Sequence, residues 1–470
     1  LLETFVDPRC FTGTSDRDAN CPEVRQTREY RRTRADYSDR ADGAKRVFVC
    51  PLIARAQARL AHPMRDPLDH DGAPKLMLSA KQMRSLPEFF ADVPDPRRSQ
   101  GRRHPLPAVL AIAAGAVLCG ARGDKAIPAW AKDLGQAARA RFGCRYRHGR
   151  YEVPSRTRIR DMLTRVDPGA LDQAVQGWNA QLAADDEGLA IDGKTMCNAI
   201  DAEGRQTHIL GVVGHQTQRC HTQKKVASLP VDGSDELKRT NEIGMAIPVL
   251  EPLDIAGKTI TADALLTQRK LAEYLVERGA HFLFTAKDNQ PTLSADIRLH
   301  FAERAEADFR EPWSLHHGRL ERRSIWTSTA LNASLDFPHV GQIFAIERHT
   351  IEKKTGKVSI ETVYGVTDHT PDSADPARLL GFNRGHWGVE AHHWILDWNW
   401  DEDHCTIRTG HGPENITRLR RFAIGLIKAK SNDSVSATID KLARKVRRVF
   451  DYLGMTANSA PRAAQSAPAG

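Results

Sequence analysis

The sequence lacks the patterns that identify several common classes of protein. Its eight cysteines are scattered over 470 residues with no C-x-x-C pair, which argues against a disulfide framework or a zinc ribbon and favours a reducing compartment. It contains neither a G-x-x-x-x-G-K-[ST] phosphate loop nor a serine nucleophile elbow, so ATP-driven chemistry and serine catalysis have no support. The longest apolar run, residues 106–120, falls short of the roughly 20 residues that cross a bilayer, so we expect no membrane span.

The beginning of the chain shows no signal-peptide pattern, and secretion is not expected. Residues 1–78 are polar, rich in Arg and Asp and without clear periodicity, which predicts disorder or loose helix. The chain starts with Leu1 and its first methionine is Met64. We therefore expect residues 1–78 to be a disordered or non-native extension, and residues 1–63 not to belong entirely to the native product.

The composition is that of a soluble globular protein, with 40% hydrophobic and 27% charged residues. The formal net charge of +9 is distributed unevenly. Residues 81–180 carry +9 and residues 404–470 carry +8, whereas residues 181–403 carry −10. Basic ends around an acidic centre favour a polyanionic partner, although solvated basic faces are the simpler alternative.

The residue pattern divides the rest of the chain into segments. Residues 79–183 have helical periodicity punctuated by Pro and Gly, which predicts a basic all-α domain. Residues 184–430 predict a second domain, with a β-rich insertion at about residues 320–370. Residues 431–454 predict a basic C-terminal helix, and the Ala, Pro and Ser-rich residues 455–470 predict a disordered tail.

The second domain alternates predicted strands with predicted helices. Short apolar runs predict strands at 188–192, 208–213, 223–227, 258–263 and 281–286. Helical periodicity lies between them at 235–250, 267–278 and 292–304. This alternation predicts an α/β fold in which helices flank a mixed sheet.

Three acidic residues of this domain are candidates for chemistry. Asp192 and Asp263 each end a predicted strand, and Glu390 lies in a long predicted helix, RGHWGVEAHHWILDW. Carboxylates at the carboxyl ends of neighbouring strands converge at the edge of an open sheet, where ligands bind. Three acidic side chains suit a hard cation, so we expect Mg²⁺ or Mn²⁺, and two such ions can support in-line phosphoryl transfer.

Periodicity places Glu390 at the border between two faces of its helix. One face carries an apolar stripe that we expect to pack in the core, formed by Trp387, Ala391, Trp394 and Trp398. The adjoining polar flank carries His386, Glu390, His393 and Asp397. The sequence therefore predicts that Glu390 lines a groove beside the core.

Eight motifs follow one another between about residues 80 and 454. They are DPRRSQGRRHPL (95–106), LAIDGKT (189–195), RTNEI (239–243), TADALLTQ (261–268), KDNQPTL (287–293), HGRLER (317–322), RGHWGVEAHHWILD (384–397) and EDHCTIRTG (402–410). In these motifs the sequence resembles the bacterial insertion-sequence transposases of the D-D-E class, specifically the H-repeat-associated group. The resemblance implies a ribonuclease H-like catalytic domain that cuts double-stranded DNA at the ends of a mobile element and joins it to target DNA. It also implies a dimer on DNA and a cytoplasmic, nucleoid-associated location.

The resemblance assigns roles to individual residues. It implies that Asp192, Asp263 and Glu390 are the catalytic triad that binds two Mg²⁺ or Mn²⁺ ions. The residues that it implies for DNA contact are Lys194, Lys287, Asn289, Arg319, Arg322, Arg384 and His386. We also hypothesise that the basic helical domain and the C-terminal helices bind phosphates, the latter through Arg418, Arg420, Arg421, Lys441, Arg444, Lys445, Arg447 and Arg448.

The sequence departs from the family pattern in several places, and two of the changes bear on DNA contact or activity. Cys197 stands where the family usually has Arg, and Leu266 stands where a His is common. Neither change removes a carboxylate of the triad. They leave two alternatives open: an inactive or domesticated relative that acts as a DNA-binding protein, and a stand-alone nuclease of the same fold.

Overall fold

The computed structural model describes residues 84–456, except 183–184, 231–234, 288, 305 and 317, and the backbone of short strands before them. The chain forms two compact units, Leu1–Lys75 and Leu76–Gly470. The described strands of the first unit occupy positions where we expected disorder or loose helix: β1 (Leu2–Val6), β2 (Glu23–Gln26), β3 (Arg31–Arg32), β4 (Tyr37–Ser38) and β5 (Arg46–Cys50). The rest of residues 1–78 and most of the expected tail at 455–470 lie outside the described residues.

The described strands of the first unit form two small antiparallel sheets. Strands β1, β5 and β2 form a sheet in this order, and β3 pairs with β4. The non-native origin of this region stays a prediction.

Helices dominate the first part of the second unit: α3 (Leu86–Phe90), η2 (Ser99–Gly101), α4 (Leu106–Leu118), α5 (Ala126–Asp133), α6 (Gln136–Arg141), α7 (Arg156–Arg165) and α8 (Pro168–Asn179). The region is not all-α as expected, because β6 (Arg145–Arg147) and β7 (Arg150–Glu152) form a hairpin. Its turn residues His148 and Gly149 both take positive φ, the backbone geometry of a tight two-residue turn.

The C-terminal helices complete the core of this helical region. They are α14 (Gly412–Lys430), α15 (Val435–Arg444) and α16 (Arg447–Tyr452), so two helices occupy the segment predicted as one at 431–454. Helix α4, rich in alanine, is buried along nearly its whole length and packs against α14, α15 and α16. One continuous apolar core therefore joins the two basic ends of the sequence.

The centre of the second unit is a mixed sheet of ten strands in the order β10-β9-β8-β11-β12-β17-β16-β15-β13, with β14 paired to β15. Its first half comprises β8 (Gly188–Ile200), β9 (Arg205–Gly214), β10 (Cys220–Pro230), β11 (Thr259–Ala262) and β12 (His281–Ala286). The pairs β8–β9 and β9–β10 are antiparallel, whereas β11 runs parallel to β8 and β12. The predicted α/β fold with a mixed sheet is thus confirmed.

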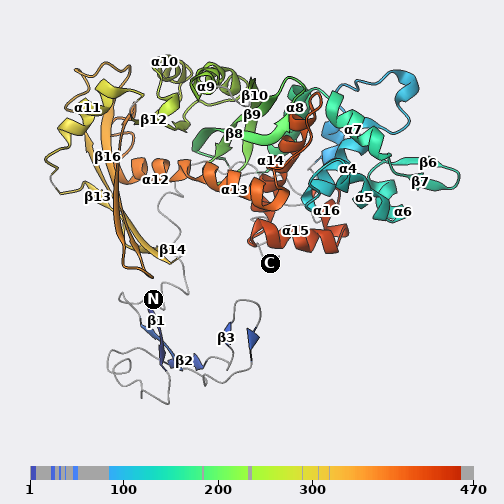
Figure 1. Cartoon of the computed structure of the whole chain (residues 1–470), viewed down its shortest axis with the longest axis horizontal. Helices are drawn as coiled ribbons and strands as arrows, with labels where there is room; N and C mark the ends of the chain where they lie inside the picture. Colours follow the sequence, from blue (N-terminus) through green and yellow to red (C-terminus); the bar gives the residue numbers. More distant parts are fainter. Residues whose placement is uncertain are drawn as a thin grey trace, which may run out of the picture. The chain divides into compact units, whose positions relative to one another are not determined.

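The remaining strands extend the same sheet. They are β13 (Phe309–Arg310), β14 (Ser314–His316), β15 (Arg319–Ser328), β16 (Gln342–Glu352) and β17 (Val358–Thr367). The strands expected at about 320–370 are present, but β17 pairs with β12 through residues 364–367 and so continues the central sheet. The parts of β15, β16 and β17 that reach beyond β12, with β14 at their end, are called the β arm below (Figure 1).

Helices cover both faces of the sheet (Figure 1). On one side lie α9 (Asp235–Leu250) and α10 (Arg269–Glu277), and on the other lie α12 (Pro376–His386) and α13 (Gly388–Trp400). The expected single helix around Glu390 is divided, since α12 ends at His386 and α13 begins at Gly388. Helix α11 (Pro291–His300) packs against β16 and β17. In the described part of the chain, no helix combines the length and apolarity that a membrane span requires.

Candidate catalytic site

The two strand aspartates lie next to each other. Ile191 of β8 pairs with Ala262 of β11 in a parallel register, so the residues that follow, Asp192 and Asp263, are neighbours across the two strands. Asp263 follows the last residue of β11 as predicted, and it caps the short helix η3 (Ala264–Leu266). Asp192 does not end its strand, because β8 continues to Ile200 through its pairing with β9. The parallel pairing of β8 with β11 ends at Ile191, whereas the antiparallel pairing of β8 with β9 continues. The Asp192 side chain is therefore partly exposed at this edge of the sheet.

Glu390 comes from α13, one of the helices that cover the sheet, and lies toward the same edge. It lies in the first turn of α13 and is exposed. Helix α13 packs against β8, and α12 packs against β8 and β11. The structure therefore brings all three predicted carboxylates to one region of the molecule.

The pKa values of the two aspartates are both raised, because their carboxyl groups are partly buried and lie near other negative charges. Partial burial, followed by the charge of Asp263, raises the pKa of Asp192 from 3.8 to about 7, with further contributions from Glu242 and Glu390. Partial burial and the charge of Glu242 also raise the pKa of Asp263. Strongly shifted carboxyl groups in one cluster are typical of functional sites.

Glu242 is a further carboxylate whose charge acts on both aspartates, and the sequence reasoning missed it. It lies on α9, is largely buried, and its Oε1 atom is 2.7 Å from Nε2 of His208. The signal for it was the RTNEI segment, which carries the family resemblance but had been given no role. Its approach to Asp192 depends on how α9 packs on the sheet, and that packing is not visible in the sequence.

Lys287 and Asn289 lie on the same side of the sheet as Asp263. Lys287 follows β12, is exposed, and its positive charge opposes the rise in the pKa of Asp263. Asn289 donates a hydrogen bond to the carbonyl oxygen of Ala264, next to Asp263. Both residues therefore lie near the carboxylates, as a DNA contact at this site requires.

Arg384 and His386 belong to α12 and not to the helix of Glu390. Arg384 is exposed and its Nη1 atom is 2.7 Å from Oε1 of Glu311. Burial lowers the pKa of His386 to about 4, and its Nδ1 atom lies 3.1 Å from the hydroxyl of Thr261. His386 is thus neutral at physiological pH, which does not suit the phosphate-binding cation that we had inferred for it.

Lys194 is enclosed by carboxylates. Its side chain is 9% exposed, and its Nζ atom lies 2.7 Å from Asp397 and 3.0 Å from Asp403. The ion pairs join β8 to α13 and to the segment after it. The structure therefore gives Lys194 a local partner for its charge in place of the open position expected of a DNA contact.

Arg319 and Arg322 lie on the β arm. Arg319 is exposed at the first position of β15, where it pairs with Glu352 of β16. The guanidinium of Arg322 lies over the ring of Trp313, 4.6 Å from its centroid. The arm extends away from α12 and α13 (Figure 1), so these two arginines are not part of the carboxylate cluster.

The expectation that the tryptophan stripe of α13 packs in the core is wrong. Trp387, Trp394 and Trp398 are 42%, 60% and 64% exposed. The buried face of α13 is formed instead by Val389, His392, Ile395, Leu396 and Trp400. Both sets follow a helical period, and the contacts with β8 and α14 select the second.

Three of the C-terminal arginines expected to bind DNA are buried. Arg418 pairs with Asp172 at 2.7 Å, Arg420 pairs with Glu402 at 3.0 Å, and Arg421 is 1% exposed. All three lie on α14, which is buried along most of its length, so their side chains point into the protein and are not on its surface. The basic residues of α15 and α16 and the loop between them do face solvent: Lys441, Arg444, Lys445, Arg447 and Arg448.

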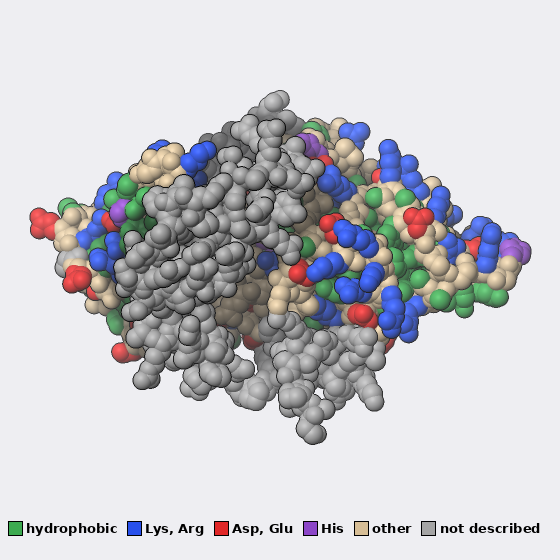
Figure 2. Space-filling model, turned by 90° about the horizontal axis from the view of Figure 1, so that it is seen from below, with side chains coloured by type: hydrophobic (Ala, Val, Ile, Leu, Met, Phe, Trp, Pro, Cys, Tyr) green, Lys and Arg blue, Asp and Glu red, His purple; other side chains and the backbone are tan. Residues whose placement is uncertain are grey.

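Basic side chains also cover the surface of the helical region. Figure 2 shows Lys and Arg side chains gathered over this part of the molecule, at the right of the view. Exposed members are Arg141, Arg147, Arg150, Arg156, Arg158 and Arg160. Such a surface is typical of proteins that bind the phosphates of nucleic acid.

The side chains near this edge of the sheet offer carboxylate oxygens, which are the type of ligand atom that suits a divalent cation. Carboxylate oxygens are the ligands that Mg²⁺ and Mn²⁺ prefer. Among the residues that the structure describes, no three His, Cys, Asp or Glu side chains stand close enough together to hold a metal ion. The fit therefore rests on the chemistry of Asp192, Asp263 and Glu390 and on their shared edge of the sheet.

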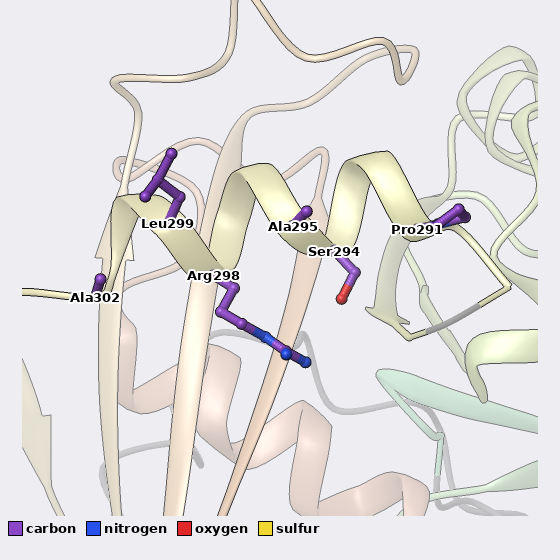
Figure 3. A pocket seen from close by; sticks show the side chains of 6 residues that line it. All are labelled: Pro291, Ser294, Ala295, Arg298, Leu299 and Ala302. Carbon is purple, nitrogen blue, oxygen red and sulfur yellow. The ribbon is translucent and has the colours of Figure 1, made fainter.

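A groove of about 420 Å³ runs along α11, and none of these carboxylates lines it (Figure 3). It is lined by Pro291, Ser294, Ala295, Arg298, Leu299 and Ala302. Since its lining contains no acidic residue, it offers no ligand for a hard cation.

Comparison with known proteins places the chain in a family. The family described as "Transposase DDE domain" matches residues 184–424, and the family "DDE_Tnp_1-associated" matches residues 87–179. The chain is 27% identical to the Escherichia coli K12 protein YbfL over 392 residues, or 79% of this chain and 97% of YbfL. It is 26% identical to the H repeat-associated candidate transposase YhhI of the same organism, again over 392 residues with 79% and 97% coverage.

A solved structure, the piggyBac transposase synaptic complex with hairpin DNA, is similar at a TM-score of 0.38 and 12% identity, covering 82% of this chain and 78% of that one. At this score the similarity does not define the fold. The match to the DDE domain spans more than half of the residues and confirms the resemblance drawn from the motifs. The chain belongs to the transposase DDE domain family.

Proposed function

We propose that the chain is a DNA transposase whose triad, Asp192, Asp263 and Glu390, cuts DNA at the ends of an insertion sequence and joins the freed 3′ end to target DNA. The observation that carries the proposal is that Asp192 and Asp263 are neighbours across β8 and β11, with Glu390 near enough for its charge to contribute to the raised pKa of Asp192. The strand order of the central sheet, three antiparallel strands followed by the parallel β11 and β12, supports a ribonuclease H-like fold for the catalytic domain.

The triad would hold two Mg²⁺ or Mn²⁺ ions, which supply charge neutralisation and in-line activation for phosphoryl transfer when bound. The chain's own residues orient the DNA. Lys287 is an exposed cation whose charge acts on Asp263, Arg384 is an exposed cation near the end of α12, and Asn289 bonds to the backbone beside Asp263. These positions suit contacts to the phosphates that flank the scissile bond.

The rest of the DNA would lie on the basic surfaces of the helical region. Exposed arginines of α7 and of the β6–β7 hairpin, together with the basic residues at 441–448, would form phosphate-binding surfaces around one shared core. Because two element ends must be brought together, we propose a dimer on DNA. Its site of action would be the bacterial nucleoid in the cytoplasm.

A strand-transfer assay tests this function. The full chain is incubated with Mg²⁺, DNA that carries the terminal repeats of its element and a target plasmid, beside the Asp192→Asn variant. Joined product that is lost in the variant supports the proposal. Cutting without joining would support the nuclease alternative, and DNA binding without either reaction would support an inactive, DNA-binding relative.

A further inference from the structure

The β arm carries an exposed apolar face. Cross-strand pairing places one apolar side chain from each of its four strands in a single row: Leu315, Leu320, Ile351 and Val358. Leu315 and Val358 are both 53% exposed. Ile360, two residues after Val358 and so on the same face, is 59% exposed. Exposed apolar side chains gathered on one face are typical of an interaction surface.

Strand β17 also has an open edge along this face. Its residues 364–367 pair with β12, whereas among the described strands residues 358–363 pair only with β16. The N–H of Glu352 donates to the carbonyl oxygen of Lys357, so the alternate residues Val358, Ile360 and Thr362 direct their backbone N–H and C=O groups to the open edge. Residues 358–363 contain no proline and their pairing has no bulge, two features that protect exposed edges from another strand.

The sequence of this edge is complementary to itself. In an antiparallel pairing centred on Ser359, Lys357 lies opposite Glu361 of a second copy, and Val358 lies opposite Ile360 of that copy. A two-fold axis repeats both pairs on its other side. Opposite charges and apolar side chains that face each other are the cross-strand pairs that stabilise antiparallel sheets. The paired residues, 357–361, also lie outside the part of the edge that β12 occupies.

The two charged side chains are available for this contact. Lys357 and Glu361 are both exposed, and both lie on the face of the arm opposite to the apolar row. The Oε2 atom of Glu361 is 2.7 Å from Nη2 of Arg348, yet the Glu361 side chain remains 62% exposed. A carboxylate accepts several hydrogen bonds, so Glu361 can bind Arg348 and a lysine of a second copy together.

We infer that two copies of the chain dimerise through their β arms, by antiparallel pairing of β17 with β17 about Ser359. The partner is a second copy because the charges and the apolar side chains of this strand complement those of the same strand. The pairing joins the two central sheets into one. This inference deepens the proposed function and rests on it for one point, the use of the dimer to bring two element ends together.

Charge reversal at the edge tests the pairing. The full chain is studied by sedimentation velocity, alone and with duplex DNA that carries the terminal repeats. Lys357→Glu places carboxylates opposite each other, and Glu361→Lys places ammonium groups opposite each other. We expect each variant to raise the dissociation constant of the dimer about tenfold or more. Lys270→Glu, which reverses an exposed charge on α10, is the control and should leave this constant unchanged.

A mixture of the two variants separates strand pairing from damage to the fold. When Lys357→Glu and Glu361→Lys chains are mixed in equal amounts, every substituted position of the mixed dimer again faces a residue of opposite charge. We expect the mixture to dimerise nearly as tightly as the wild type. A chain that had merely lost its fold would not be rescued by a second damaged chain.

Three results would overturn the arm dimer: a wild type that stays monomeric both alone and on DNA, single variants that dimerise like the wild type, and a mixture that stays monomeric. The strand-transfer assay reports separately on the proposed function. A wild type that dimerises through the arm but joins no DNA would remove that function and leave the arm dimer. Arm variants that dimerise and join DNA like the wild type would remove the arm dimer and leave the function.

Discussion

Trp394 and Trp398 stack on each other, with ring centroids 5.6 Å apart and planes 12° from parallel, and both side chains are exposed to solvent. Trp394 lies about one helical turn after Glu390 on α13. Exposed apolar surface of this kind marks a binding site more often than a free surface. Flat aromatic rings beside the proposed catalytic site suit the faces of unpaired bases.

Replacing either tryptophan is predicted to weaken binding of DNA that has unpaired bases at its end. Stacking contributes about 1–3 kcal/mol per base, so Trp394→Ala or Trp398→Ala should lower affinity about tenfold, with a smaller effect on blunt duplex. Fluorescence anisotropy with labelled frayed and blunt DNA measures both. Leu299→Ala, which removes a side chain 77% exposed on α11, is the control. Equal losses on both DNA forms would contradict stacking.

The metal-free protein is predicted to lose stability as the pH rises from 5 to about 7. The pKa of Asp192 is raised from 3.8 to about 7 in the folded chain, which therefore keeps a proton that the unfolded chain releases near pH 4. The stabilisation is complete below pH 4 and is lost as the pH passes 7. Urea midpoints across this range should fall more for the wild type than for Asp192→Asn, and Mg²⁺ at pH 8 should raise the wild-type midpoint. Parallel profiles of the two proteins would refute the assignment.

Lys194→Met is predicted to affect stability more than DNA affinity. The substitution leaves Asp397 and Asp403 without their shared cation, but both carboxylates are at least a third exposed, so solvent screens part of the loss. We expect the free energy of unfolding to drop by about 1–3 kcal/mol. Urea unfolding and DNA anisotropy on the same preparation measure the two effects, with Lys270→Met, at an exposed position of α10, as control. A loss of DNA affinity at unchanged stability would restore Lys194 as a DNA contact.

Exposed cations of the C-terminal helices are predicted to contribute phosphate contacts. Arg444→Ala and Arg447→Ala should each weaken DNA binding for all sequences and reduce the slope of log K against log salt by about 1. Affinities measured between 50 and 200 mM salt, roughly the range over which such contacts weaken, give this slope. Lys270→Ala removes an exposed cation of α10, on the opposite side of the sheet from α12 and α13, and should leave the slope unchanged. A slope that changes equally in all three variants would point to overall charge instead.

The sequence predicted the strands that carry the aspartates because these strands are buried apolar runs with polar ends. The runs at 188–192, 258–263 and 281–286 fall within or at the ends of β8, β11 and β12. Their order in the sheet, which makes Asp192 and Asp263 neighbours, comes from long-range pairing that no local pattern encodes.

Helix orientation was harder to predict than helix position. On α13 two apolar stripes share the helical period, and only the contacts with β8 and α14 decide that Val389 faces the core while Trp394 faces water. The same holds for Arg420, whose charge suggested a surface position until its partner Glu402, 18 residues earlier, was located. Glu242 was missed because its neighbours come from β8 and β9.

The unbroken hydrogen-bonding of the sheet has a mechanical consequence. Backbone hydrogen bonds run from the arm strand β17 to β12 and from β12 to β11, the strand that Asp263 follows. The arm therefore has no break in strand pairing between it and the strand before Asp263, and we expect it to move together with that strand. Four strand pairings connect β15, which carries Arg319 at the end of the arm, to β11, so a molecule bound at the arm would act on a strand of the same hydrogen-bonded sheet.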